Sequence, residues 1–169
     1  PREMRVLPHS HVDIGYSAPQ PEVERKQWRN LRDAVALARA TADFPPAARF
    51  RWNVEGLWYV ESYLAQATAE EREALLGAVR GGAIGLQANT TGVLTGLCTP
   101  EELRRLTDGA RRLRAAHGLP PIRSAMQSDI PGVSWTAAAA LAQAGVRYLS
   151  SGPNYFTGLP GGGDRIGRP

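Results

Sequence analysis

The chain has 169 residues, of which 43% are hydrophobic and 21% charged, as in an ordinary globular domain and unlike a disordered segment. The formal net charge is +4, but the arginines alternate with acidic residues along expected helices, which favours solvated helix faces over a nucleic-acid-binding stripe. No run of about 18 apolar residues occurs, so we expect no membrane span. The single cysteine, Cys98, excludes an internal disulfide and a cysteine-cluster metal site.

Both ends of the chain carry information about its context. The first residues lead directly into an expected strand, without the basic and apolar regions of a signal peptide. We therefore expect a cytoplasmic protein, or a secreted one whose upstream signal peptide has been removed. The closing segment LPGGGDRIGRP is loop-like. We expect residues 1–169 to be a single domain, the N-terminal part of a longer chain with further C-terminal domains.

Five apolar segments typical of strands alternate with helical segments. We expect strands at residues 4–8, 49–53, 83–88, 122–126 and 146–149. Helices are expected at residues 22–42, 57–66, 68–81, 99–118 and 134–145.

Two of the expected helices begin with a capping box. Thr68 is followed three residues later by Glu71, and Thr99 is followed in the same way by Glu102. Gly81 is expected to end the first of these helices in a left-handed conformation.

The order of strands and helices predicts a parallel sheet with right-handed crossovers, either doubly wound or most of a β/α barrel. Neither a G-x-G-x-x-G after the first strand nor a phosphate-binding P-loop is present, which weakens the nucleotide-binding alternative. Polar residues follow all five expected strands, where side chains converge in parallel α/β folds. Five such clusters favour one pocket in a barrel.

The residues after the first expected strand are typical of metal ligands. His11 and Asp13 are two positions apart in an extended segment, so their side chains point the same way and can reach one ion. His9 has the same parity. Asp129, after the fourth expected strand, adds a carboxylate. Zinc accepts this mixture of nitrogen and oxygen ligands, so we expect Zn²⁺ or another divalent metal at these residues.

Residues 7–16, LPHSHVDIGY, and residues 127–134, QSDIPGVS, resemble two segments of the N-terminal catalytic domain of family 38 glycoside hydrolases, the α-mannosidases. The first is similar to that family's P-H-S-H-x-D-x-G-W segment. The second is similar to its Q-x-D-P-F-G-H-S segment. Between them, an aromatic strand containing Trp52 is followed by Glu55, as in the family.

The resemblance implies an irregular seven-stranded β/α barrel, of which about five strands are present here, and retaining hydrolysis of α-mannosides or related α-glycosides. It implies metal binding by His11, Asp13 and Asp129, with Asp129 also the catalytic nucleophile. A carbohydrate is then the substrate. We expect Tyr16, Trp52, Glu55 and Asn89 to contact it.

The chain departs from the family pattern at several positions. Tyr16 replaces a tryptophan, Val133 replaces a histidine, and the family's last zinc ligand and its acid/base carboxylate have no counterpart here. Two alternatives therefore stay open. One is an H-x-H metal-dependent hydrolase of the amidohydrolase or phosphoesterase type, suggested by His9 and His11. The other is a non-catalytic carbohydrate-binding remnant of the barrel.

Overall fold

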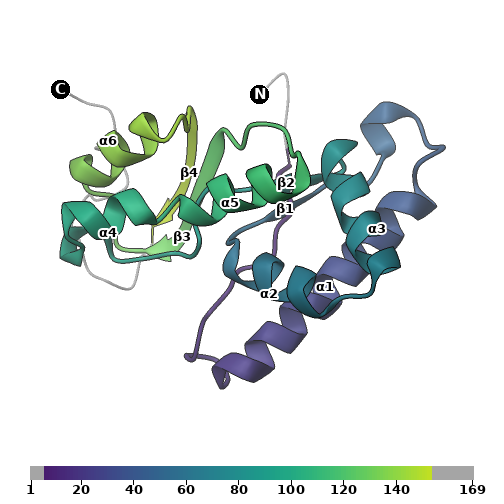
Figure 1. Ribbon diagram of the computed structural model, residues 1–169, viewed down its shortest axis with the longest axis horizontal. Coiled ribbons are helices and arrows are strands. Elements are labelled where there is room, and N and C mark those ends of the chain that lie inside the picture. Colours follow the sequence, from purple (N-terminus) through teal and green to yellow (C-terminus); the bar gives the residue numbers. More distant parts are fainter. Residues whose placement is uncertain (1–5, 154–169) are drawn as a thin grey trace.

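Helices and short strands alternate along the chain (Figure 1). The structure is a computed structural model and describes residues 6–153. Within that range the α-helices and strands are, in order, α1 (Gln20–Ala40), β1 (Trp52–Val54), α2 (Trp58–Gln66), α3 (Ala69–Arg80), β2 (Ile84–Leu86), α4 (Pro100–Arg105), α5 (Asp108–His117), β3 (Ser124–Ile130), α6 (Trp135–Gln143) and β4 (Tyr148–Pro153). Two short 3-10 helices, η1 (Pro46–Ala48) and η2 (Thr95–Leu97), complete the set.

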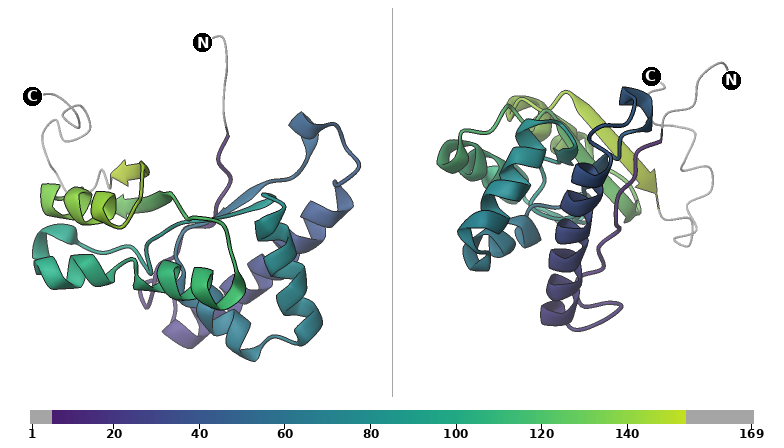
Figure 2. Two further views of the ribbon diagram at one scale, coloured as in Figure 1. Left: turned by 45° about the horizontal axis from the view of Figure 1, so that its top comes forward. Right: turned by 90° about the vertical axis from the view of Figure 1, so that its right-hand side faces the viewer.

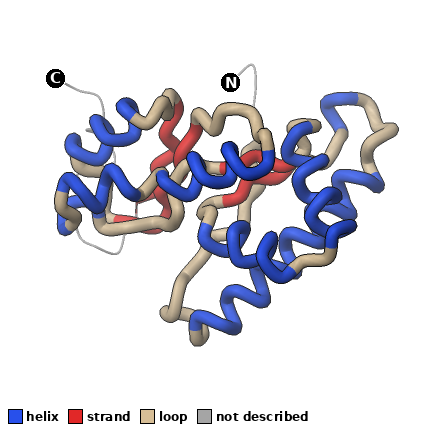
Figure 3. Tube along the Cα trace, in the orientation of Figure 1, coloured by secondary structure: helices blue, strands red, loops and turns tan. Residues whose placement is uncertain are grey.

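The strands form two separate two-stranded parallel sheets (Figure 3). In the first, β1 pairs with β2 from Trp52–Ile84 to Val54–Leu86. In the second, β3 pairs with β4, beginning at Ser124–Tyr148. Helices α1 and α3 pack against the first sheet and α2 packs on α1, whereas α4 and α6 pack together beside the second sheet (Figures 1 and 2).

The predicted barrel is wrong for the residues that the structure describes. Its α/β alternation and parallel pairing are confirmed, but the strands form no continuous sheet. Between β2 and β3 the amide of Ala88 donates to the carbonyl of Ser124 at 2.7 Å, without a ladder between the two strands. A barrel requires paired neighbours all the way round. The order of apolar segments predicts which strands are parallel but not how far each pairing extends. The domain is a small α/β domain.

The first expected strand, residues 4–8, lies partly outside the described residues. Its described part forms no strand; the chain instead makes an isolated parallel bridge between His9 and Asn53. The amide of Asn53 donates to the carbonyl of Pro8 at 2.8 Å. The N-terminal segment therefore lies alongside β1 (Figure 1), held by these local contacts.

Local helix signals were predicted more accurately than the sheet. Both capping boxes are present, with Thr68 and Thr99 each accepting from the backbone amide three residues later. The helix expected at residues 99–118 is instead two helices. The carbonyl of Leu106, at the break, accepts hydrogen bonds from both the amide and the hydroxyl of Thr90. Gly82, not Gly81, adopts the left-handed conformation after α3.

The hydrophobic core lies mainly between the first sheet and helices α1, α2 and α3. Its most deeply buried members come from all of these elements: Leu31, Val54, Leu57, Tyr59, Leu75 and Ile84. Burial of this apolar surface fixes β1 relative to the helices. Among residues 6–153, no helix has the length and apolar character needed to cross a membrane.

Candidate metal and active site

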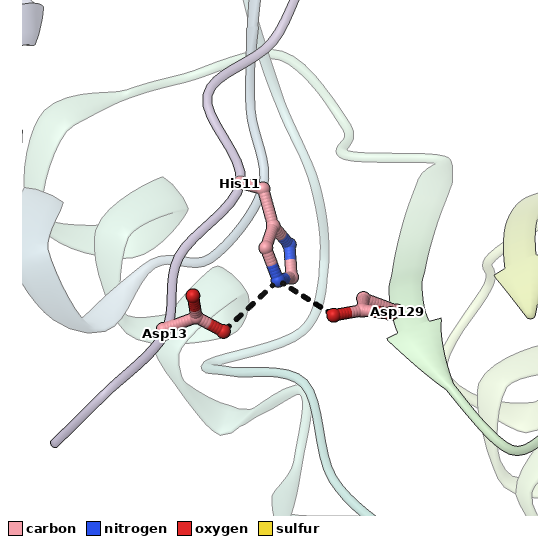
Figure 4. Close-up of side chains that lie close together, drawn as sticks. All are labelled: His11, Asp13 and Asp129. Atoms are coloured by element: carbon pink, nitrogen blue, oxygen red, sulfur yellow. Dashed lines mark ion pairs between the residues drawn. The ribbon is translucent and has the colours of Figure 1, made fainter. Parts of the chain in front are cut away.

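Three side chains from distant parts of the sequence meet at one point (Figure 4). His11 and Asp13 come from the N-terminal segment, and Asp129 comes from β3. Each offers one ligand atom, and these atoms all lie within 4.8 Å of one another. The Nε2 atom of His11 is 3.2 Å from an Asp13 oxygen and 3.6 Å from an Asp129 oxygen.

These separations suit a metal ion. Zinc–nitrogen and zinc–oxygen bonds of about 2.0–2.1 Å in a tetrahedron place neighbouring ligand atoms about 3.3 Å apart. The two distances at His11 Nε2 lie on either side of that value. One imidazole and two carboxylates also form a donor set that zinc accepts. The three residues therefore fit a divalent ion in both geometry and chemistry.

The backbone at Asp129 directs its side chain to the cluster. Asp129 has a φ of 53°, the only positive φ of a non-glycine residue in the described part of the chain. The register of β3 against β4 shifts there, since Ser128 pairs with Gly152 and Ile130 with Pro153. Asp129 is thus the extra residue of a β-bulge. Bulges commonly redirect a side chain next to functional sites.

His11 is held from its other side by Glu55. The Nδ1 atom lies 3.1 and 3.2 Å from the two carboxylate oxygens of Glu55, which follows β1. Partial burial lowers the pKa of the His11 imidazole. Glu55, through its hydrogen bond and its charge, and the charges of Asp13 and Asp129 outweigh that effect, so the pKa is raised above its ordinary value.

The cluster opens into a pocket of about 470 Å³. Trp58, Tyr16, Ile14 and Leu94 supply apolar walls, while the three candidate ligands supply polar groups. An apolar cavity with a few convergent polar groups is the usual form of a small-molecule site.

The four predicted substrate contacts fall in different places. Tyr16 lines the pocket and is 91% exposed. Glu55 also lines it, but its side chain is only 7% exposed. Trp52 is buried in the hydrophobic core, and Asn89 is fully buried, with its amide donating to the carbonyl of Met126. Neither Trp52 nor Asn89 lines the pocket.

Two further residues near the site differ from what the sequence suggested: His9 lies outside the cluster, and Trp58 lies in the pocket. His9, which has the same parity as His11, is exposed, bridges Asn53 through its backbone and is not part of the three-residue cluster. Trp58 lines the pocket, although no motif in the sequence marks it as a site residue. Its position three residues after Glu55, beyond the carboxyl end of β1, was the available signal.

The fold and the cluster together define a class: an α/β domain with a candidate metal site formed by the N-terminal segment and the carboxyl-terminal part of β3. Residues 1–152 match the N-terminal domain of glycosyl hydrolases family 38. Because this match covers most of the chain, the protein belongs to that family. No curated protein matches the chain significantly.

Solved structures show a similar fold. The crystal structure of an alpha-mannosidase from Enterococcus faecalis V583 has a TM-score of 0.64 at 18% sequence identity, over 86% of this chain and 16% of that one. A glycosyl hydrolase family 38 protein from Enterococcus faecalis has a TM-score of 0.60 at 16% identity, over 85% of this chain and 16% of that one. The chain thus spans about one sixth of the length of these two proteins.

Proposed function

We propose that the protein is a metal-dependent glycoside hydrolase that acts with retention on α-mannosides or related α-glycosides, and that this chain carries three of the metal ligands and the nucleophile. The observation that carries the proposal is the cluster of His11, Asp13 and Asp129 at a pocket, in a chain that belongs to family 38. Zinc bound there would supply Lewis-acidic contacts to sugar hydroxyl groups.

Asp129 is the best-placed nucleophile among the described residues. Its side chain is 52% exposed and lines the pocket, whereas Glu55 is buried against His11. In a retaining mechanism this carboxylate attacks the anomeric carbon, and a covalent glycosyl-enzyme forms as the bond to the leaving oxygen breaks.

A second carboxylic acid must protonate the leaving oxygen. Within residues 6–153, the other acids that line the pocket are Asp13 and Glu55, and both face His11. We therefore place the general acid in the remainder of the protein. Tyr16 and Trp58 also line the pocket, where an aromatic ring can pack against a sugar. The described residues would therefore form the metal and nucleophile side of the active site, and the rest of the protein would supply the acid side.

The test uses the Asp129→Ala variant in the full-length protein. We expect hydrolysis of an aryl α-mannoside to fall by at least about 10³-fold, because the residue is proposed to act as nucleophile. Glu61→Ala, which changes an acid that pairs with Arg112 instead of lining the pocket, should keep its activity. Unchanged turnover in Asp129→Ala would contradict the assignment.

A covalent trap tests retention separately. A fluorinated mannosyl fluoride should add one sugar mass to the peptide that contains Asp129, since the deglycosylation step is slowed. Labelling of a different carboxylate would show that Asp129 is not the nucleophile. Sugar binding without any hydrolysis would instead support the non-catalytic alternative.

A further inference from the structure

Glu55 is buried at the base of the candidate metal site, with both carboxylate oxygens engaged. Its side chain is 7% exposed, although it follows β1 in a loop. Both oxygens face Nδ1 of His11, at 3.1 and 3.2 Å. The Oε2 atom also accepts the backbone amide of Val12 at 2.9 Å. Because these two groups occupy the carboxylate, Glu55 is not arranged as a sugar contact.

We propose that Glu55 is a positioning residue, which holds His11 with the proton on Nδ1 and Nε2 directed toward the metal, and which fixes the backbone between His11 and Asp13. The inference rests on the metal site proposed above. A carboxylate accepts but cannot donate a hydrogen bond. The imidazole nitrogen that faces it must therefore carry the proton, which leaves the lone pair of a neutral imidazole on Nε2, the atom that faces Asp13 and Asp129.

The contact to Val12 gives Glu55 a second effect. Val12 lies between the two candidate ligands of the N-terminal segment, and its amide is bound by the same carboxylate. One buried group therefore sets both the ring of His11 and the path of the chain that leads to Asp13. In the described residues the N-terminal segment belongs to no regular strand before α1. Contacts of this kind must supply its order.

Glu55 itself is held by the ends of two paired strands. The amides of Leu57 and Trp58 donate to the carbonyls of Asn89 and Thr90, beyond the end of β2. At Gly56 a Cβ would lie 3.0 Å from the carbonyl oxygen of Thr90, so any side chain there would push the two loops apart by a few tenths of an ångström. The carboxylate is thus attached to a rigid part of the molecule.

The experiment compares zinc affinity by calorimetry, at about pH 8, in the full-length wild type and in the Glu55→Ala, Glu55→Gln and Glu61→Ala variants. Loss of a carboxylate partner of a ligand histidine typically weakens metal binding by about 10–100-fold, and we expect Glu55→Ala to do so. Glu55→Gln retains an oxygen acceptor and should lose less. Glu61→Ala removes an acid whose partner is Arg112 and should bind like wild type.

A second readout separates positioning from a general loss of structure. In the zinc-bound wild type, the ¹⁵N NMR signals of His11 should report a protonated Nδ1 and a metal-bound Nε2. In Glu55→Ala the ¹⁵N signals of His11 should indicate a mixture of the two imidazole tautomers, while circular dichroism shows that the chain is still folded. If Glu55→Ala does not fold, Glu55→Gln carries the same test because its shape is nearly unchanged.

The outcomes distinguish this inference from the proposed function. Wild-type affinity and an unchanged His11 pattern in both Glu55 variants would overturn the positioning role and leave the metal site intact. A wild type that binds no zinc or other divalent metal would overturn the metal site itself, and the role of Glu55 with it. A zinc affinity that falls from wild type to Glu55→Gln to Glu55→Ala would support both the metal site and the positioning role of Glu55.

Discussion

At the scale of single residues, Asp129 combines an uncommon backbone conformation with a proposed chemical role. Its φ of 53° lies in the left-handed region, which costs an ordinary L-residue roughly 1–2 kcal/mol, although aspartate and asparagine tolerate it better than most. The bulge in β3 imposes this conformation, and it aims the carboxylate at His11. Backbone strain of this kind is frequent at functional sites.

A matched pair of substitutions measures that strain. Asp129→Gly and Asp129→Ala remove the same carboxylate, so the loss of charge affects both alike. Glycine accepts the left-handed conformation and alanine does not, so we expect Asp129→Gly to be more stable by about 1 kcal/mol. Urea unfolding of the two metal-free variants gives the difference. If the Asp129→Ala variant had the same free energy of unfolding as Asp129→Gly, the backbone would be able to leave the left-handed conformation at little cost.

At the scale of elements, the loop after β1 joins the site to the core. It carries Glu55, and Gly56 permits its close approach to Thr90. Because β1 is only three residues long, its few ladder bonds cannot alone set the position of this loop. The hydrogen bonds of Leu57 and Trp58 to the residues beyond β2 supply the remaining restraint.

Substitution of Gly56 by alanine should therefore affect stability and metal binding together. The added Cβ would meet a backbone oxygen at 3.0 Å, and relief of such a contact in a packed region costs about 1–3 kcal/mol. We expect denaturant unfolding to show this loss, and zinc affinity to fall as Glu55 shifts.

Gly77 provides the control for that experiment. It lies in the exposed face of α3, and a Cβ there has no neighbour within 4 Å. Gly77→Ala should raise stability by about 0.5–1 kcal/mol, because alanine favours a helix interior, and should leave zinc affinity unchanged. Equal effects of the two substitutions would argue against the close contact at Gly56.

At the scale of the whole molecule, the sequence predicted local features well and long-range ones unevenly. The capping boxes and the alternation of strands and helices depend on neighbouring residues, and they are confirmed. His11, Asp13 and Asp129 were selected from strand-end positions, and the structure brings them together. Their metal binding stays a prediction.

The sequence was a poor guide to features that depend on packing between residues far apart in the chain, and the predicted barrel was wrong for this reason. Closure into a barrel depends on pairing between β2 and β3, which the pattern of apolar residues does not encode. The family resemblance implied a substrate contact at Trp52, and the structure places this residue in the hydrophobic core, where it does not line the pocket; the contact itself stays a prediction. Glu55 was found by its position, but its partner, His11, lies 44 residues away in sequence.

The separation of the two sheets leads to a prediction about metal and stability. Two candidate ligands, His11 and Asp13, lie on the segment that bridges β1, and the third, Asp129, lies on β3 of the other sheet. A bound ion would therefore join parts of the molecule that share no strand ladder. A ligand that binds only the folded state adds about 2.7 kcal/mol to the free energy of unfolding at one hundred times its dissociation constant.

We expect zinc to raise the free energy of unfolding by that amount at the corresponding concentration, and a chelator to reverse the effect. Amide exchange should slow in both β1 and β3, because the ion links the two sheets. In Asp129→Ala the increment should fall sharply, since one of the three ligands is absent. An increment of full size in that variant would place the bound zinc elsewhere, for example at His9 or His117, and would separate metal binding from the proposed nucleophile.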